Sequence, residues 1–149
     1  MTDPVLSSLL RINRQRLRFL RHSALNPNRY VGVMHLVVGY VGRSPGASQE
    51  DIVCFYALDK ASVARAARRL EDMGHIRREI DPDNRRQYRL FLTEAGEEMF
   101  AVIGRAHEDF QRRLSAGFSP EDWAQLAGLL QRLEENIRFG QPCQGRPHG

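Results

Sequence analysis

Residues 58–96 read LDKASVARAARRLEDMGHIRREIDPDNRRQYRLFLTEAG, and the hydrophobic period changes once within this stretch. Over residues 60–73 apolar side chains recur every three or four positions, which predicts an amphipathic helix. Gly74 follows where a helix commonly ends in the left-handed conformation. The next residues alternate with a period of two, which predicts a β-hairpin with strands over 75–81 and 86–92.

A second, shorter helix is predicted directly before the first. Ser48 begins the run S-Q-E-D, in which an N-cap residue is followed three positions later by an acid, ahead of apolar residues. This helix is expected over about 49–56, and Asp59 then caps the helix that follows it. Two helices at a tight turn, the second of them basic, followed by a two-stranded ribbon, are the order of a winged helix-turn-helix. The expected fold class is therefore mostly α with a small β-hairpin wing.

The flanking segments predict further helices. Apolar and basic stripes at three- and four-residue steps indicate an amphipathic helix over 5–25. Residues 30–42 are nearly all apolar and suit a buried helix, although their valines also suit a strand. Thr93 caps a long helix with an acidic first turn, and S-P-E-D at 119–122 opens the last one. The apolar spacing of these helices suits helix packing within one chain or across a two-fold axis.

Charge is distributed unevenly along the 149 residues, whose formal net charge is +4. Residues 4–49 contain seven arginines and no acid, 59–92 carry a net charge of +3, and 94–138 carry a net charge of −4. A basic front and an acidic rear suggest a polyanionic partner on one side. The first helix carries an arginine stripe that suits either a solvated face or a phosphate-facing flank, and the sequence alone slightly favours the solvated face. The stripe consists of Arg11, Arg14, Arg18 and Arg21.

The exposed side of the helix over 60–73 has the chemistry of a DNA-reading surface. A helix enters the major groove only if this side is rich in hydrogen-bond donors and short side chains. Arg65 can pair with both acceptors of a guanine edge, and two adjacent arginines beside the hairpin turn suit a narrow minor groove. A solvated face is the competing interpretation for each arginine taken singly. The turn is Pro82-Asp83-Asn84-Arg85, and the candidate DNA-binding residues are Ser48, Gln49, Lys60, Ala61, Ser62, Arg65, Arg68, Arg69, Arg85 and Arg86.

The run over 58–96 resembles the signature of the MarR family, the multiple-antibiotic-resistance type of bacterial winged helix-turn-helix transcription regulators. The shared features are a leucine-aspartate entry, a serine- and arginine-bearing recognition helix, a glycine stop, an arginine-bearing wing, and leucine-threonine-x-alanine-glycine at the next helix. This resemblance implies a homodimer that binds a pseudo-palindromic operator in double-stranded DNA, usually as a repressor. It also implies a cleft between the dimer part and the reading head, where small aromatic molecules often bind and release the DNA.

Carried over residue by residue, the resemblance places Ser62 and Arg65 at base-reading or phosphate-contacting positions and Arg86 in the minor groove. One residue departs from the pattern, because Asn84 stands where an aspartate usually pairs with the wing arginine, and Asp83 is the candidate substitute. The implied organisation is one domain over 1–149, with the winged helix-turn-helix at 44–93, dimerisation helices at 5–43 and 94–139, and a disordered tail at 140–149.

Two further sets of residues follow from the helical stripes. Apolar positions on the first and last helices are the dimerisation candidates, namely Leu6, Leu10, Trp123, Leu126, Leu130, Leu133 and Ile137. Histidines and aromatic residues on neighbouring helices are candidates for lining an effector cleft, although an aromatic residue at helical spacing is more often plain core. The effector candidates are Phe19, Tyr30, His35, Tyr40, His107 and Phe110.

Other classes of protein lack their signatures in this sequence. No GxSxG, HExxH or phosphate-cradling glycine loop occurs, so we expect no enzyme. The five histidines have no second ligand three or four residues away, so we expect neither a metal site nor a cofactor. No run of eighteen apolar residues and no secretory signal occur, which favours a soluble cytoplasmic protein without a membrane partner.

Two alternative functions stay open at this point. Cys54 and Cys143 are far apart in sequence and are interpreted as unpaired thiols, but oxidation of either one would make the chain a thiol-responsive regulator. A winged helix can also be a protein interaction module that never touches DNA. Such a module is expected to expose an apolar or acidic second helix, and the second helix here is basic.

Overall fold

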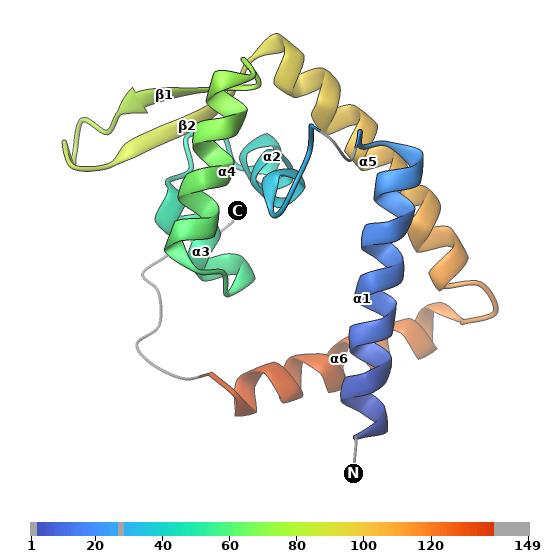
Figure 1. The fold of residues 1–149 in the computed structure, drawn as a ribbon. Coiled ribbons are helices and arrows are strands. Elements are labelled where there is room, and N and C mark those ends of the chain that lie inside the picture. Colours follow the sequence, from blue (N-terminus) through green and yellow to red (C-terminus); the bar gives the residue numbers. More distant parts are fainter. Residues whose placement is uncertain (1–2, 27–28, 139–149) are drawn as a thin grey trace.

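The computed structural model describes residues 3–26 and 29–138. Within these residues the chain forms six helices and one antiparallel pair of strands (Figure 1). The elements are α1 (Pro4–Ser23), α2 (Met34–Arg43), α3 (Gln49–Tyr56), α4 (Lys60–Asp72), β1 (Ile76–Ile80), β2 (Tyr88–Leu92), α5 (Glu94–Leu114) and α6 (Pro120–Asn136). The predicted fold class is confirmed, since α3, α4 and the hairpin form a winged helix-turn-helix with helices on both sides of it in sequence.

The predicted helix caps are present. The Ser48 side chain accepts a hydrogen bond from the backbone N–H of Asp51, whose carboxylate accepts from the N–H of Ser48, which makes a reciprocal capping box. Asp59 caps α4 by accepting from the N–H of Ser62 at 2.7 Å, and Thr93 caps α5 in the same way. These local bonds fix the first residues of α3, of the recognition helix α4, and of α5, which follows the wing.

Two predicted boundaries differ from the structure. The helix expected over 30–42 begins only at Met34, because Gly32 has a φ of +56° and the preceding residues form a turn. The hairpin strands, expected over 75–81 and 86–92, are shorter because the wing loop closes its own hydrogen bonds. The backbone N–H of Asp81 donates to the carbonyl of Gln87 at 3.0 Å. The paired strands end one residue before this bond, at Ile80 and Tyr88.

The winged helix-turn-helix, formed by α3, α4, β1 and β2, is called the reading head below. The hydrophobic core joins this reading head to α1 and α5. Fully buried side chains come from every helix except α6 and from both strands. Helix α6 buries no side chain, and Figure 1 shows it as an arm below the winged helix-turn-helix. The largest fully buried side chains are those of Leu20, Met34, Ile52, Leu70, Ile76, Leu90 and Ile103. None of the described helices is long and apolar enough to span a bilayer.

A second, isolated pairing lies at the base of the wing. Ala47, in the loop before α3, forms an isolated antiparallel bridge with Leu90 of β2. Leu90 donates to the carbonyl of Ala47 and accepts from the N–H of Gly46, both at 2.8 Å. The sequence predicted only a loop here, since two residues are too short for a strand pattern. The bridge ties the start of the helix-turn-helix directly to the wing.

The first turn of α5 lies very close to the strand entry at His75. The carbonyl of His75 accepts from the backbone N–H of Thr93 at 3.0 Å, and a Cβ added to Gly96 would lie 2.0 Å from that carbonyl oxygen. The imidazole of His75 is also held, because its Nδ1 is 2.7 Å from the hydroxyl of Tyr30 in a buried hydrogen bond. His75 therefore connects the loop before α2, the start of β1 and the start of α5.

Candidate nucleic-acid interface and the adjoining cavity

Helix α4 separates its residues sharply into two faces. Val63, Ala66, Ala67 and Leu70 are buried against the core, as their three- and four-residue spacing requires. The opposite face is exposed and carries most of the candidate DNA-binding residues of this helix, which are Lys60, Ala61, Arg65, Arg68 and Arg69. Core packing thus orients the helix so that its basic side faces outward.

The start of α4 holds two of the candidates in local bonds. Arg65 is exposed and donates one side-chain hydrogen bond to Ser62 Oγ at 3.2 Å. Lys60 lies 3.5 Å from a carboxylate oxygen of Glu50 in α3, and both side chains are largely exposed. An ion pair in this setting contributes little to stability, so a phosphate can compete for Lys60. The partnership with Glu50 was not foreseen from the sequence.

Ser48 and Gln49 are half-buried at the start of α3. Ser48 Oγ is already occupied as an acceptor by its capping box, at 3.1 Å from the N–H of Asp51. Its hydroxyl hydrogen is still able to donate to a phosphate oxygen. The start of α3 is thus suited to a contact with the phosphate backbone of DNA and not to the recognition of bases.

The wing carries its two adjacent arginines on the loop between β1 and β2. Arg85 and Arg86 are exposed, and the backbone N–H of Arg86 donates to Asn84 Oδ1 at 3.2 Å. Asp83, the candidate substitute for the usual aspartate, instead lies 3.4 Å from Arg89, which is also 3.0 Å from Asp81. In this wing the carboxylates therefore brace the loop through Arg89, and the guanidinium of Arg86 is left for an external partner.

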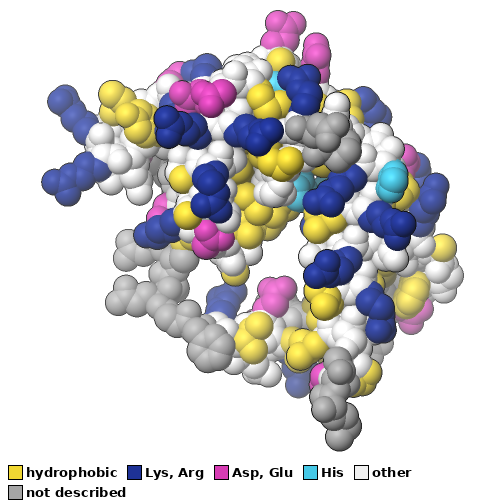
Figure 2. Space-filling model, viewed as in Figure 1, with side chains coloured by type: hydrophobic (Ala, Val, Ile, Leu, Met, Phe, Trp, Pro, Cys, Tyr) yellow, Lys and Arg dark blue, Asp and Glu magenta, His cyan; other side chains and the backbone are white. Residues whose placement is uncertain are grey.

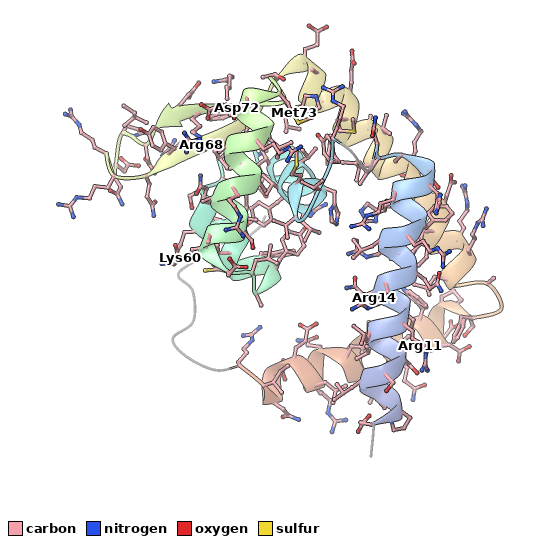
Figure 3. The ribbon with its side chains drawn as sticks, in the orientation of Figure 1. Arg11, Arg14, Lys60, Arg68, Asp72 and Met73 are labelled. Carbon is pink, nitrogen blue, oxygen red and sulfur yellow. The ribbon has the colours of Figure 1, made fainter. Side chains whose placement is uncertain are left out.

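The outward arginines of α4 and the wing carry uncompensated charge. Within residues 3–26 and 29–138, no ion pair involves Arg65, Arg68, Arg69, Arg85 or Arg86. In particular Arg68 and Asp72, both labelled on α4 in Figure 3, do not form the internal pair that their spacing allows. Figure 2 shows basic side chains over the visible face of α4 and at the tip of the wing. Such a surface is complementary to a polyanion.

A cavity of about 490 Å³ adjoins this reading head where α1, α2 and α5 meet the turn between α3 and α4. It is lined by Asn13, Arg16, His35, Leu36, Gly39, Arg43, Tyr56, Leu58, Phe100, Ile103, Gly104 and His107. The lining contains apolar and aromatic surface, two arginines and two histidines, and it contains no carboxylate. A small apolar molecule with a negative charge matches this composition.

His35 carries an unsatisfied hydrogen-bonding atom at this cavity. The side chain is only 6% exposed, and its Nε2 has no hydrogen-bond partner. Its pKa is lowered to about 4, first by burial and then by the charges of Arg16 and His107, so the ring is neutral at pH 7. A hydrogen bond with the backbone of Gly32 opposes this shift, which identifies the carbonyl as its acceptor and Nδ1–H as the donor. Nε2 is consequently a free acceptor.

The two arginines of the cavity are positioned by neutral partners. Arg43 donates to the hydroxyl of Tyr56 at 2.6 Å, and Arg16 donates to Asn13 Oδ1 at 3.1 and 3.4 Å. Burial lowers the pKa of Arg16, and burial followed by the charges of Arg16 and Arg43 lowers the pKa of His107. Both guanidinium groups thus remain without a neutralising carboxylate in the lining of a partly buried site.

The structure brings together only part of the predicted effector set. His35 and His107 line the same cavity, and His107 with Phe110 also lines a more open hollow between α1 and α5. Phe19 packs on Phe110, with ring centroids 5.6 Å apart. Tyr30 is bonded to His75, and the buried Tyr40 lies against Phe55 and Tyr56 in the core.

Sequence reasoning missed Arg16, Arg43 and Tyr56. Arg16 had a usable signal, since it falls outside the three- and four-residue steps of the arginine stripe and therefore points to a different side of the first helix. Arg43 and Tyr56 had none, because their meeting depends on how α2 packs against α3.

Cys54 differs from the state expected for it. It is half-buried on α3 and is disulfide-bonded, and none of the cysteines within the described ranges is free. The prediction of an unpaired thiol is thus wrong for Cys54. Cys143, the other cysteine of the sequence, and the expected tail over 140–149 lie outside the described residues. No cluster of three potential metal ligands occurs among the residues that the structure describes.

The dimerisation candidates lie on α1 and α6, except that Ile137 follows the last turn of α6. Large apolar side chains are exposed on both helices. Exposed apolar side chains that are gathered in this way usually mark a surface that binds another protein. Trp123 and Leu130 are half-buried, whereas Leu6, Leu10, Leu126, Leu133 and Ile137 are exposed. Val5, Ile12 and Leu129 belong to the same exposed set and were not among the candidates.

A basic recognition helix, a basic wing and two flanking helices with exposed apolar faces define a DNA-binding winged helix-turn-helix protein. The sequence model of the MarR family matches residues 36–88. The crystal structure of MarR is 30% identical, with a TM-score of 0.73, and the match covers 91% of this chain and 94% of that chain. The structure of the transcriptional regulator SlyA is 27% identical with a TM-score of 0.75, over 91% of this chain and 94% of that chain.

A curated relative agrees with these structures. YybA from Bacillus subtilis (strain 168), described as an uncharacterised HTH-type transcriptional regulator, is 29% identical over 103 residues, which are 69% of this chain and 69% of YybA. The chain belongs to the MarR family of transcription regulators. It is accordingly a DNA-binding regulator and not an enzyme, from a family whose members typically bind DNA as dimers.

Proposed function

We propose that this chain is a homodimeric repressor that recognises a pseudo-palindromic sequence in double-stranded DNA and releases it when a small aromatic anion binds. The observation that carries the DNA part is the outward, uncompensated arginine set of α4 and the wing. In a two-fold dimer the recognition helices would enter major grooves about 34 Å apart, one turn of B-DNA. A dimer that covers two half-sites at a promoter blocks access of the polymerase, which accounts for repression.

Arg65 and Arg86 are assigned different tasks, and mutation separates them. Arg65→Ala should weaken binding by about 1 to 3 kcal/mol and relax the base preference at one position of each half-site. Arg86→Ala should weaken binding more evenly across sequences, because a minor-groove arginine responds mainly to shape and potential. Selection of bound fragments from random duplex DNA, followed by titration of the winning and scrambled duplexes, measures both effects.

Arg105→Gln is a suitable control for this pair, because Arg105 is exposed on α5 and is not among the candidate DNA-binding residues. It removes one charge and should leave both affinity and preference close to those of the wild type. Wild-type affinity in both Arg65→Ala and Arg86→Ala would remove the assignment of these residues to DNA.

The effector part of the proposal is supported by the cavity lined by His35, Arg16 and Arg43. An anionic group can accept hydrogen bonds from the two guanidinium groups, which have no carboxylate in the cavity lining. The acceptor Nε2 of His35 lacks a donor, so a ligand hydroxyl satisfies a buried atom that is otherwise unpaired. Phe100, Ile103 and Tyr56 supply the apolar surface for a ring. The favoured ligand is thus an aromatic acid with a hydroxyl group.

Three probes distinguish the charge from the hydroxyl group. 4-Hydroxybenzoate should bind more tightly than benzoate or phenol, and saturating amounts should lower the affinity for the selected duplex. Arg16→Gln should weaken 4-hydroxybenzoate binding by roughly tenfold to a hundredfold, the usual worth of a charged hydrogen bond, and should leave phenol binding nearly unchanged. Calorimetry measures binding, and fluorescence anisotropy of the labelled duplex measures release.

Arg105→Gln again provides the charge-matched control, with unchanged binding of all three probes. Equal loss of 4-hydroxybenzoate and phenol in Arg16→Gln would contradict a charge-pairing role. Binding of none of these probes to the wild type would remove aromatic acids of this size as the effector class.

A further inference from the structure

The four residues of the α1 arginine stripe neither line the cavity nor belong to the candidate DNA-binding set. Its four members recur at steps of three and four residues and are all exposed, so they share one face of the helix. Leu20, the buried residue of α1, and Arg16, which lines the cavity, point to other sides of the same helix. The stripe consists of Arg11, Arg14, Arg18 and Arg21.

Within the part of the chain that the structure describes, no acidic side chain neutralises the charge of this stripe. Among the described residues none of its members takes part in an ion pair, and the only side-chain hydrogen bond is from Arg11 to Ser8 Oγ at 3.2 Å. The helix contains no acid, and its N-cap Asp3 lies at the far end from Arg18 and Arg21. Four arginines on one helical face without an acid repel one another, which costs stability unless an anion covers them.

Arg11 and Arg14 of the stripe and the exposed residues Lys60 and Arg68 of the recognition helix are visible from the same side of the molecule (Figure 3). In the view of Figure 2, basic side chains cover the visible faces of both α1 and α4. The wing lies on one side of α4, and α1 lies on the other (Figure 1). In this view a duplex docked on α4 would have the wing on one flank and α1 on the opposite flank.

We propose that this arginine stripe is a second phosphate-binding surface, which contacts the DNA backbone in the segment between the two half-sites. The assignment to the central segment follows because α1 also carries exposed apolar residues of the dimer face, and so lies nearer the two-fold axis than the wing does. This inference rests on the proposed DNA-binding function. The contacts are to phosphates and carry no base preference, since long arginine side chains at a helix flank bind backbone oxygens.

The salt dependence of DNA binding tests this surface. We compare the wild type with R14Q/R18Q and with the charge-matched R105Q/R132Q, whose two arginines are exposed on α5 and α6. Removal of one arginine–phosphate pair should reduce the slope of log Kobs against log[KCl] by about 0.9. R14Q/R18Q removes two arginines from each subunit of the proposed dimer, so the slope should fall by about 0.9 for every pair lost, up to about 3.6 in all, and binding of the selected duplex at low salt should be weaker by roughly tenfold or more. R105Q/R132Q should keep the wild-type slope, and R14K/R18K should restore most of it, because a phosphate requires only the charge.

Neutral methylphosphonate linkages locate the contact without changing the protein. Placed between the half-sites, they should weaken the wild type but cause no further loss in R14Q/R18Q. Placed at the outer ends of the duplex, they should weaken both proteins equally. The modified duplexes also test the proposal if R14Q/R18Q proves unstable, because they need only the wild-type protein. Wild-type binding that is insensitive to neutral linkages between the half-sites would overturn the proposal.

Arg65→Ala separates this inference from the proposed function. If Arg65→Ala weakens binding while R14Q/R18Q matches R105Q/R132Q in slope and affinity, the stripe is a solvated face and only this inference fails. If Arg65→Ala and R14Q/R18Q are both indistinguishable from the control, the DNA-binding assignment of the whole basic face fails with it.

Discussion

Glutamates at Leu126 and Leu133 of α6 are expected to convert the dimer into a monomer and to weaken binding of the two-half-site duplex by about 10² to 10⁴-fold. The two leucines are 39% and 44% exposed in the single chain, and α6 buries no side chain of its own. We propose that a second copy of the chain covers the exposed part of both side chains. Two carboxylates per subunit in that interface cost several kcal/mol each when they are buried without a partner.

The loss of DNA affinity follows from linkage of the two reading heads. In a dimer the second recognition helix binds at a high effective concentration once the first is seated, a gain typically of about 10² to 10⁴. A monomer retains α4 and the wing and should bind a single half-site as before. Light scattering at micromolar concentration gives the mass, and titration of one-site and two-site duplexes gives the affinities.

Val31→Glu is the matched control for this change. Val31 is 40% exposed, close to the value for Leu126, but it lies in the loop between α1 and α2 and is not among the dimerisation candidates. The mass of the Val31→Glu protein should remain that of a dimer. A dimeric mass for Leu126→Glu/Leu133→Glu would refute the assignment of α6 to the dimer interface.

Gly96→Ala is expected to destabilise the chain by roughly 3 kcal/mol or more. The added Cβ would lie 2.0 Å from the carbonyl oxygen of His75, far inside contact distance, and the obstacle is backbone that cannot rotate away. Relief requires α5 to move from the start of β1, which lengthens the bond from the N–H of Thr93 to the same carbonyl. Urea denaturation, followed by circular dichroism, measures the change in the free energy of unfolding.

Gly104→Ala tests whether this loss is specific. Gly104 lies in the same helix, and a Cβ there meets nothing within 4 Å. Since alanine favours a helix interior over glycine by about 1 kcal/mol, this variant should be as stable as the wild type or slightly more stable. Similar stabilities of Gly96→Ala and Gly104→Ala would show that the start of α5 is able to yield, contrary to the close packing described.

The reading head could be predicted from the sequence in some detail because its signals are local. The helix expected over 49–56 has those bounds in the structure, and the caps at Ser48, Asp59 and Thr93 form the predicted hydrogen bonds. Capping and turn formation involve residues within four positions of one another, so a short window of sequence contains all the partners. The outward face of α4 followed in the same way from its buried stripe.

The remaining features depend on contacts between distant residues. The bridge from Ala47 to Leu90 joins a loop to a strand more than forty positions away, and no periodic pattern marks it. The cavity arginines are another case, because Arg16 and Arg43 converge only when α1 and α2 have packed around His35. Some effector candidates were chosen because they are aromatic, and part of these, such as Tyr40, lie in the core. Aromatic character alone does not indicate whether a side chain faces a cavity or the core.

The first turn of α5 is packed tightly against the carbonyl of His75, so a rotation of this helix about that end would move its other end the most. Its 21 residues extend about 31 Å from the foot of the wing toward α6. Phe100, Ile103 and His107 lie along its middle and line the cavity. With the Gly96 end fixed to the strand entry, a tilt of roughly 5° caused by a molecule in the cavity would displace the far end by about 3 Å. In the proposed dimer, a displacement of this size where the two subunits meet would change the spacing of the two recognition helices, and a duplex of fixed helical repeat would no longer fit both.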